Sequence, residues 1–261
     1  MKSKKLYLLL IAMAFLTFSC DEDDDNVNDA IYLSEYNPSD FMFQDDVSYV
    51  YQTYYDDYSD SIDTKLASWA LKTNVIGKYD YDNKMCYEFL TIEVDLVYTN
   101  YILKDDRYLY NIGLRIVNND DVRNLPHDTN SYTYYDTLID FNKNKWTVAD
   151  VNYKYESENE GKYNIFASGE YIGTKDIYIE NMKYKAIGVL IKSNYKRYTN
   201  DTNSIMSGII FNREEEMYFV KGIGFVEGIS EESYTYGFNG KINVGKGKYE
   251  VRLVNFQKES Q

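Results

Sequence analysis

The chain has 261 residues, of which 44% are hydrophobic and 27% charged, so it is long and apolar enough for one large β domain or two small ones. It contains 30 Tyr and 12 Phe, an aromatic excess that favours β-sheets over helix bundles. The single His excludes any metal site built from two or more histidines, and a formal net charge of −14 argues against nucleic acid as a partner.

Residues 1–19 have the pattern of an export signal. Lys2, Lys4 and Lys5 form a basic start, and the apolar stretch that follows is short for a membrane span. The stretch ends in Leu-Thr-Phe-Ser-Cys, which resembles the lipobox at which bacterial lipoproteins are lipidated and cleaved. The sequence therefore predicts that residues 1–19 are a lipoprotein signal peptide and that Cys20 becomes a lipid-bearing N-terminus. An ordinary secretory signal and an uncleaved anchor are the alternatives.

The segment after Cys20 is strongly acidic, with six Asp or Glu among residues 21–29. Because like charges at this density repel each other, residues 20–30 are expected to form an extended acidic tether. An acidic run in this place resembles the surface-export signal of lipoproteins in Bacteroidota-type bacteria, which implies outer-membrane attachment and, more finely, display on the cell surface. Two alternatives stay open, namely the inner-membrane retention that Asp after the Cys signals in enterobacteria, and calcium binding by the acids.

Residues 31–261 contain no long linker and no repeat, so we expect a single β-rich domain. Two early segments, Glu88–Tyr98 and Arg107–Val117, alternate apolar and polar residues with a period of two. The apolar positions predicted to share a buried face are Leu90, Ile92, Val94, Leu96 and Tyr98 in the first segment, and Tyr108, Tyr110, Ile112, Leu114 and Ile116 in the second. Lys104-Asp105-Asp106 is the expected turn of an antiparallel hairpin between the two segments.

The pattern then predicts one short helix and a series of strands. Ile62, Leu66, Trp69 and Thr73 recur at helical spacing, with Ser59 or Asp60 as the N-cap. Later strands are expected at Asp176–Glu180, Lys185–Lys192, Ile205–Phe211, Glu216–Lys221 and Tyr249–Phe256. Turns are expected at Glu180-Asn181, Thr199-Asn200-Asp201, Asn239-Gly240 and Gly245-Lys246-Gly247. The predicted fold is mainly β, a curved antiparallel sheet or half-open barrel with at most one or two short helices.

The segment Met217–Val226, with the sequence MYFVKGIGFV, resembles a signature of β-rich envelope proteins of the TapB-like group. The resemblance extends over roughly residues 170–256, with Ile177–Ala186 in the place of an upstream strand pair. It implies a LolA/LolB-like half-barrel, and it implies a fold more than a function. Independently of the resemblance, Gly222 and Gly224 predict a bulge or a close approach of two backbones.

No catalytic constellation with a recognisable spacing is present in the sequence. His127 is expected in a loop, in preference to a Ser–His–Asp set with Asp128. Cys86 is predicted to be buried and apolar rather than a thiolate nucleophile, and no Cys or His spacing predicts a metal or a cofactor. The acids of Asp56–Asp63 are interpreted as solvated, with a cation site as the alternative. The Tyr-rich stretches 49–58, 132–135 and 153–155 suit half-buried sheet faces or, alternatively, sugar stacking.

The sequence therefore predicts a cellular location and a fold class but no reaction. The favoured function is that of a non-catalytic envelope lipoprotein whose β-sheet face binds a glycan, a lipid or a protein partner. The alternatives are a carboxylate-based glycan hydrolase and a structural subunit of a surface assembly. We assign no catalytic, cofactor-binding or metal-ligating residue; Cys20, which joins the protein to the membrane through its lipid, is the one predicted site.

Overall fold

We describe the fold from a computed structural model of the chain. It describes residues 33–57, 67–81, 83–93, 96–114, 133–154, 162–198, 206–238 and 241–258. All of them belong to one compact unit, Tyr32–Gln261. Predictions for Cys20, the acidic tether, His127 and the turns at 199–201 and 239–240 lie outside the described residues.

The described part forms one antiparallel sheet of twelve strands, in the order β6-β5-β4-β3-β2-β1-β12-β11-β10-β9-β8-β7. Two short 3-10 helices, η1 (Leu33–Glu35) and η2 (Pro38–Phe41), precede the first strand. The strands are β1 (Val47–Asp57), β2 (Ala67–Tyr81), β3 (Lys84–Glu93), β4 (Leu96–Lys104), β5 (Tyr108–Leu114), β6 (Thr133–Asp140), β7 (Lys145–Lys154), β8 (Lys162–Ile179), β9 (Met182–Tyr198), β10 (Met206–Val220), β11 (Gly224–Phe238) and β12 (Lys241–Lys258).

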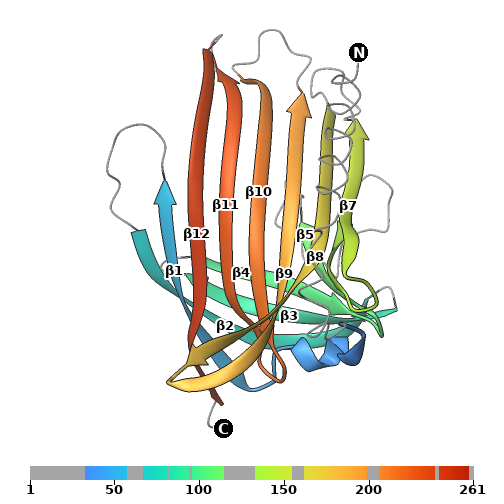
Figure 1. The fold of residues 1–261 in the computed structure, drawn as a ribbon, viewed down its shortest axis with the longest axis vertical. Helices are drawn as coiled ribbons and strands as arrows, with labels where there is room; N and C mark the ends of the chain where they lie inside the picture. Colours follow the sequence, from blue (N-terminus) through green and yellow to red (C-terminus); the bar gives the residue numbers. More distant parts are fainter. Residues whose placement is uncertain are drawn as a thin grey trace, which may run out of the picture. The chain divides into compact units, whose positions relative to one another are not determined.

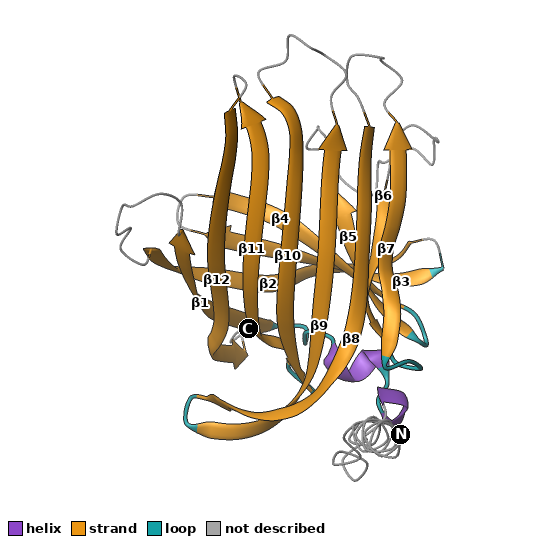
Figure 2. Ribbon diagram, turned by 45° about the horizontal axis from the view of Figure 1, so that its top comes forward, coloured by secondary structure: helices purple, strands orange, loops and turns teal. Residues whose placement is uncertain are grey.

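The sheet curves until its two outer strands come near each other. The long strands β8 to β12 stand side by side as one wall, and β2 to β4 cross behind them as a second wall (Figure 1). The same two walls are seen after a turn of the view, with the purple η helices near the lower end (Figure 2). The indole N–H of Trp146 in β7 donates to the carbonyl of Thr137 in β6 at 2.8 Å. The predicted mainly β, half-open barrel with two short helices is confirmed.

The helix predicted over residues 62–73 is wrong where the structure describes it, because residues 67–81 form strand β2. Trp69, Leu71 and Thr73 pair with Thr53, Tyr51 and Tyr49 of β1, so they share one face with a period of two. Trp69 and Thr73 are also four residues apart, so this spacing alone does not distinguish a helix face from a strand face. Among the described residues no helix is long and apolar enough to cross a membrane.

The first predicted hairpin has the correct turn but the wrong partners and the wrong face. Asp105 lies between β4 and β5, and its carboxylate accepts the backbone N–H groups of Arg107 and Tyr108. The segment 88–98, however, is broken between β3 and β4, where Glu93 pairs with Leu96. On β3 the buried inward residues are Phe89 and Thr91, while Ile92 is 41% exposed. On β5 Leu109 is buried in the main core, so the inward face is the one opposite to the prediction.

The later strands are longer than predicted. β8 contains residues 176–179 of the strand predicted at 176–180, and a turn follows at Glu180 and Asn181, which have positive φ angles of 49° and 68°. The two strands predicted at 205–211 and 216–221 form the single strand β10, which runs from Met206 to Val220. The turn predicted at 245–247 is wrong, because these residues lie inside β12. A Cβ atom at Gly245 would overlap the Tyr234 ring, so this glycine allows an aromatic side chain to lie on the strand.

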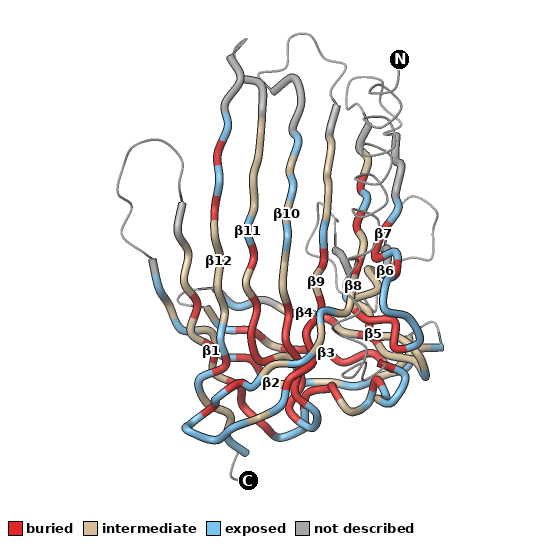
Figure 3. The backbone as a smooth tube through the Cα atoms, in the orientation of Figure 1, coloured by how far each residue is buried: buried red, intermediate tan, exposed pale blue. Residues whose placement is uncertain are grey.

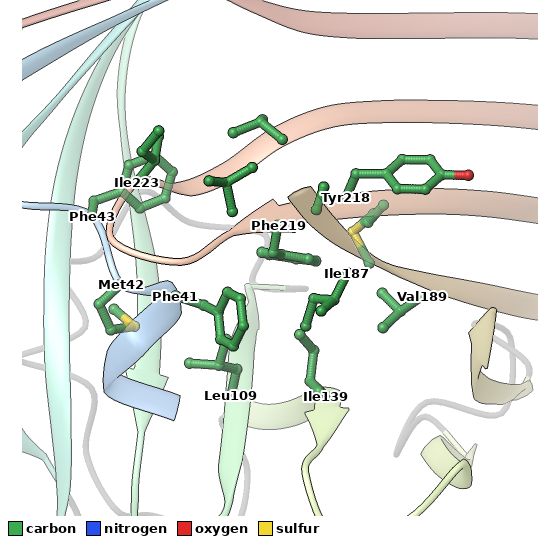
Figure 4. Close-up of a cluster of buried hydrophobic side chains, with 14 of the residues drawn as sticks. Phe41, Met42, Phe43, Leu109, Ile139, Ile187, Val189, Tyr218, Phe219 and Ile223 are labelled. Carbon is green, nitrogen blue, oxygen red and sulfur yellow. The ribbon is translucent and has the colours of Figure 1, made fainter. Parts of the chain in front are cut away.

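The main core lies at the end of the sheet where the hairpin turns and the η helices meet (Figure 3). Phe41 and Phe43, on either side of the end of η2, are buried there, in the cluster that contains Leu109, Ile139 and Phe219 (Figure 4). The Phe41 ring stacks on Phe141 with 5.6 Å between ring centroids, and Phe43 packs edge-on against Phe89 at 4.9 Å. Residues 33–46 therefore close this end of the sheet.

The turn between β10 and β11 holds this closing segment. Gly222 N–H donates to the Asp40 carbonyl at 2.6 Å, and the Gln44 side chain donates to the Gly222 carbonyl. Gly224 has a φ of +98°, and a Cβ there would lie 3.2 Å from the Phe41 carbonyl oxygen. The predicted close approach of two backbones at these glycines is confirmed, and its partner is the segment at η2.

Candidate functional site

The two walls of the sheet enclose an open cavity of about 1080 Å³ above the core. This volume is at the upper end of the range of pockets that hold small molecules. The end next to the core is apolar, with Phe43, Phe89, Met217, Phe219, Phe225 and Val251 among its lining residues. Because Phe43 belongs to the closing segment, the apolar floor depends on the packing of residues 33–46.

Small side chains keep the cavity open on one wall. Ala149 of β7, Ala167 of β8 and Ser193 of β9 lie opposite one another in register and all line the cavity. Side chains that lie directly opposite on neighbouring strands share a face of the sheet. Three small residues in a row therefore leave space where larger side chains would fill the interior.

Polar side chains cross the next level of the cavity, on β10, β11 and β12. Arg213 and Glu215 line the cavity and form an ion pair, with 2.9 Å between Nη2 and Oε1. Glu232 lies opposite Arg213, Ser230 lies opposite Glu215, and Tyr249 of β12 lies opposite Ser230. We call Arg213, Glu215, Ser230, Glu232 and Tyr249 the polar belt.

Burial changes the acid–base properties of the polar belt. Loss of water raises the pKa of Glu215, and the neighbouring Glu232 also raises it, while Arg213 opposes both effects. Burial raises the pKa of Tyr249 as well, with a further contribution from Glu93, which lies opposite Leu71 on the inward face of β3. Glu232 therefore lies close enough to Glu215, and Glu93 close enough to Tyr249, to raise the pKa of these groups.

The polar belt contains groups that the described part of the chain does not satisfy. Ser230 is 2% exposed, and its hydroxyl has no hydrogen-bond partner among the described residues. Arg213 Nε likewise has none there, nor does the indole N–H of Trp69, which is in ring contact with Tyr249. A buried polar group without a partner costs about 1–3 kcal/mol, so such groups are expected to serve a ligand or water.

The opposite wall has its own polar patch, in which three side chains are joined by hydrogen bonds. The hydroxyls of Thr73 and Thr91 lie 3.2 Å apart, and the Asn100 amide donates to Thr91 at 3.1 Å. Asn111 and Asp136 line the same wall and lie opposite each other on β5 and β6. The cavity thus has an apolar floor and polar groups on both sides above it.

The residues singled out from the sequence lie mostly away from this cavity. Cys86 is fully buried in a small cluster with Tyr101 and Leu103, which confirms the apolar interpretation, and burial raises the pKa of its thiol. Tyr49 and Tyr51 lie in the main core, more deeply buried than the half-buried sheet face expected for them, and Tyr51 also lines the cavity. The side chains of residues 56–63, 132–135 and 153–155 lie outside the described part.

Sequence reasoning missed Arg213 and Glu215. The run Asn212–Glu215 is polar at every position, and the sequence prediction leaves it between two strands, Ile205–Phe211 and Glu216–Lys221. The signal that was available is the period of two from Phe211 to Phe219, in which Arg213 and Glu215 take the inward positions. Among the described residues no group of three or more His, Cys, Asp or Glu side chains is arranged to hold a metal ion.

Comparison with known proteins gives a distant likeness in fold. No protein-family model matches the chain, and no curated protein matches it. A crystal structure of a candidate lipoprotein from Parabacteroides distasonis covers 83% of this chain and 98% of its own, at 10% identity and a TM-score of 0.41. A candidate exported protein with a YmcC-like fold from Bacteroides fragilis covers 84% of this chain and 99% of its own, at 11% identity and a TM-score of 0.37. At these values the likeness carries no conclusion about function, and the resemblance to the TapB-like group stays a prediction.

Proposed function

We propose that the protein is a non-catalytic binding protein of the cell envelope that holds a small amphipathic molecule in its cavity. The observation that carries this proposal is the combination of an open cavity of about 1080 Å³ with a phenylalanine-rich floor and unpartnered polar groups above it. An apolar body would replace water against the floor, while a polar end would satisfy groups of the polar belt.

The place of action in this proposal comes from the N-terminal sequence. The basic start, the apolar stretch and the lipobox-like Leu-Thr-Phe-Ser-Cys support lipidation at Cys20, and the acidic run after it supports attachment to the outer membrane, facing outward. A lipid-anchored protein with an open cavity would meet amphipathic molecules of the envelope or of the surroundings.

The binding proposal is tested with an uncharged apolar fluorophore. N-phenyl-1-naphthylamine is titrated into the chain carrying Cys20→Ser, which removes the proposed site of lipid attachment. We expect a saturable rise in fluorescence with one site per chain. Ala167→Phe places a ring in the cavity and is expected to weaken binding by about tenfold or more, because a pocket that no longer fits loses most of its contact area.

The matched control is Phe166→Ala, on the same strand but on the outward face, where Phe166 is 53% exposed. It should leave the affinity unchanged. If the wild-type cavity gives no saturable signal, or if both variants change the affinity equally, the cavity is not the binding site and the proposal fails.

A carboxylate-based hydrolase is the second candidate, because burial raises the pKa of Glu215 and a raised pKa suits a general acid. The ion pair with Arg213 favours the binding function, since it stabilises the charged form of Glu215 rather than the protonated acid. Turnover of a glycan panel that Glu215→Gln abolishes, with the fold unchanged by circular dichroism, would favour the hydrolase instead.

A further inference from the structure

The charges that face the cavity are unbalanced. Among the side chains that line the described cavity, Arg213 is the one cation, whereas two carboxylates, those of Glu215 and Asp136, line it. Glu232 lies opposite Arg213 on the same face of the sheet, and Glu93 is close enough to influence Tyr249. Among the described residues, two carboxylates therefore line the cavity and two more lie close to its lining residues, while the one lining guanidinium is already paired with Glu215.

Aromatic rings stand beside these carboxylates. Trp69 and Tyr249 lie with 6.3 Å between ring centroids and 48° between ring planes. Tyr195 and Phe211 lie opposite each other on β9 and β10, and both line the cavity. The faces of such rings carry partial negative charge and attract cations, most strongly where water is excluded.

The buried hydroxyl of Ser230 supplies an independent sign that a ligand belongs here. It is 2% exposed, it lies between Glu215 and Tyr249 in register, and it has no partner among the described residues. A hydroxyl group accepts hydrogen bonds as well as donating them, so a polar group of a ligand or a water molecule held by the ligand can satisfy it. Carboxylates and ring faces thus line the cavity above its apolar floor, and the unpartnered hydroxyl of Ser230 lies beside two of these lining residues, Glu215 and Tyr249.

We propose that the polar belt selects an amphipathic organic cation, in which an ammonium group is attached to an apolar body, over the corresponding anion. The inference rests on the proposed function, because it names the class of molecule that the same cavity holds. The ammonium group lies among Glu215, Glu232 and the Tyr249 ring, and the apolar body reaches the phenylalanines of the floor. A carboxylate in the same place would face several like charges in a partly desolvated site.

The test uses three soluble probes with the same ten-carbon chain: decyltrimethylammonium, decanoate and the uncharged decyl glucoside. Each is titrated below its micelle concentration into the chain carrying Cys20→Ser, by calorimetry at 0.15 M salt. We expect decyltrimethylammonium to bind at least roughly tenfold more tightly than decanoate, with the glucoside between them.

Glu232→Gln removes one inward charge without changing the size of the side chain, and it is expected to weaken decyltrimethylammonium binding by roughly threefold or more. Glu231→Gln is the matched control, since Glu231 is the exposed neighbour on the outward face of the same strand. If the two variants bind the cation equally well, the polar belt does not select it and the inference is overturned.

The outcomes separate this inference from the proposed function. If decanoate binds as tightly as the cation or more tightly, the charge preference is wrong while the cavity remains the binding site. If none of the three ten-carbon probes binds and N-phenyl-1-naphthylamine does not bind either, the proposed function itself fails. Tighter binding of the cation, lost in Glu232→Gln and kept in Glu231→Gln, is the result that supports the inference.

Discussion

Phe41→Ala tests whether the segment 33–46 is part of the core rather than a loop lying on it. Phe41 is 2% exposed and packs against Phe141 and, edge-on at 5.3 Å, against Tyr36. An aromatic side chain buries roughly 150–250 Å², which at about 25 cal/mol per Å² gives about 4–6 kcal/mol as an upper estimate. Measured losses for buried Phe→Ala are about 3–5 kcal/mol. We therefore expect the free energy of unfolding to fall by roughly 4 kcal/mol.

The loss is measured by urea unfolding, followed by tryptophan fluorescence, and by thermal unfolding. For a domain of this size the melting temperature should fall by about 8–16 °C. Phe166→Ala removes the same ring from an exposed position and should cost less than about 1 kcal/mol. Phe41→Leu keeps most of the apolar volume and should fall between the two, so that the series remains readable if Phe41→Ala does not fold. Equal losses for Phe41→Ala and Phe166→Ala would refute the reasoning.

Three further predictions concern other parts of the chain. Asp140 accepts two hydrogen bonds from the Arg107 guanidinium, at 2.8 and 2.7 Å. Burial acts to raise the pKa of Asp140, but these bonds and the hydrogen bond from the Asn142 N–H hold the pKa below its ordinary value. The contribution of Asp140 to stability is therefore present above about pH 4 and is lost as the pH falls through the folded-state pKa. The free energy of unfolding of Asp140→Asn should consequently depend less on pH in this range than that of the wild type. An unchanged pH dependence would contradict the role given to Asp140. Gly169→Val would force a Cβ into the Trp146 ring, so we expect a loss of about 1–3 kcal/mol by urea unfolding, whereas Thr174→Val, on an exposed part of the same strand, should cost little. Cys20→Ala should release the protein from the membrane fraction and abolish incorporation of labelled fatty acid, and a wild-type protein that incorporates none would rule out lipidation.

The general class of the fold could be predicted from the sequence because alternation with a period of two is a local signal. The predicted turns at Asp105 and at Glu180-Asn181 were correct, since short runs of acidic residues or Asn favour turns without help from distant parts of the chain. The assignment of faces was less successful. On β3 both Phe89 and Leu90 are apolar, and only the packing of Phe89 against Phe43 determines which face is inward.

The candidate site was harder to predict than the fold for a physical reason. At the level of the polar belt, β10 carries polar residues on both faces, so Arg213 and Glu215 resemble solvent-exposed residues in the sequence. Their partners Ser230 and Tyr249 are separated from them by one or two hairpins and become neighbours only through the register of the sheet. Single-sequence reasoning has no means of seeing that register.

Aromatic rings rest on glycines at several directly opposed positions of neighbouring strands: Tyr234 with Gly245, Trp146 with Gly169, and Tyr218 with Gly188. For Trp146 and Tyr218, sliding either strand by two residues would put the ring opposite a residue with a side chain instead of opposite a glycine. Long neighbouring strands such as β8 to β12 offer many competing registers, and these contacts between a ring and a glycine favour one register over the others. The level at which the cavity groups meet is thus fixed by glycines that themselves touch no ligand.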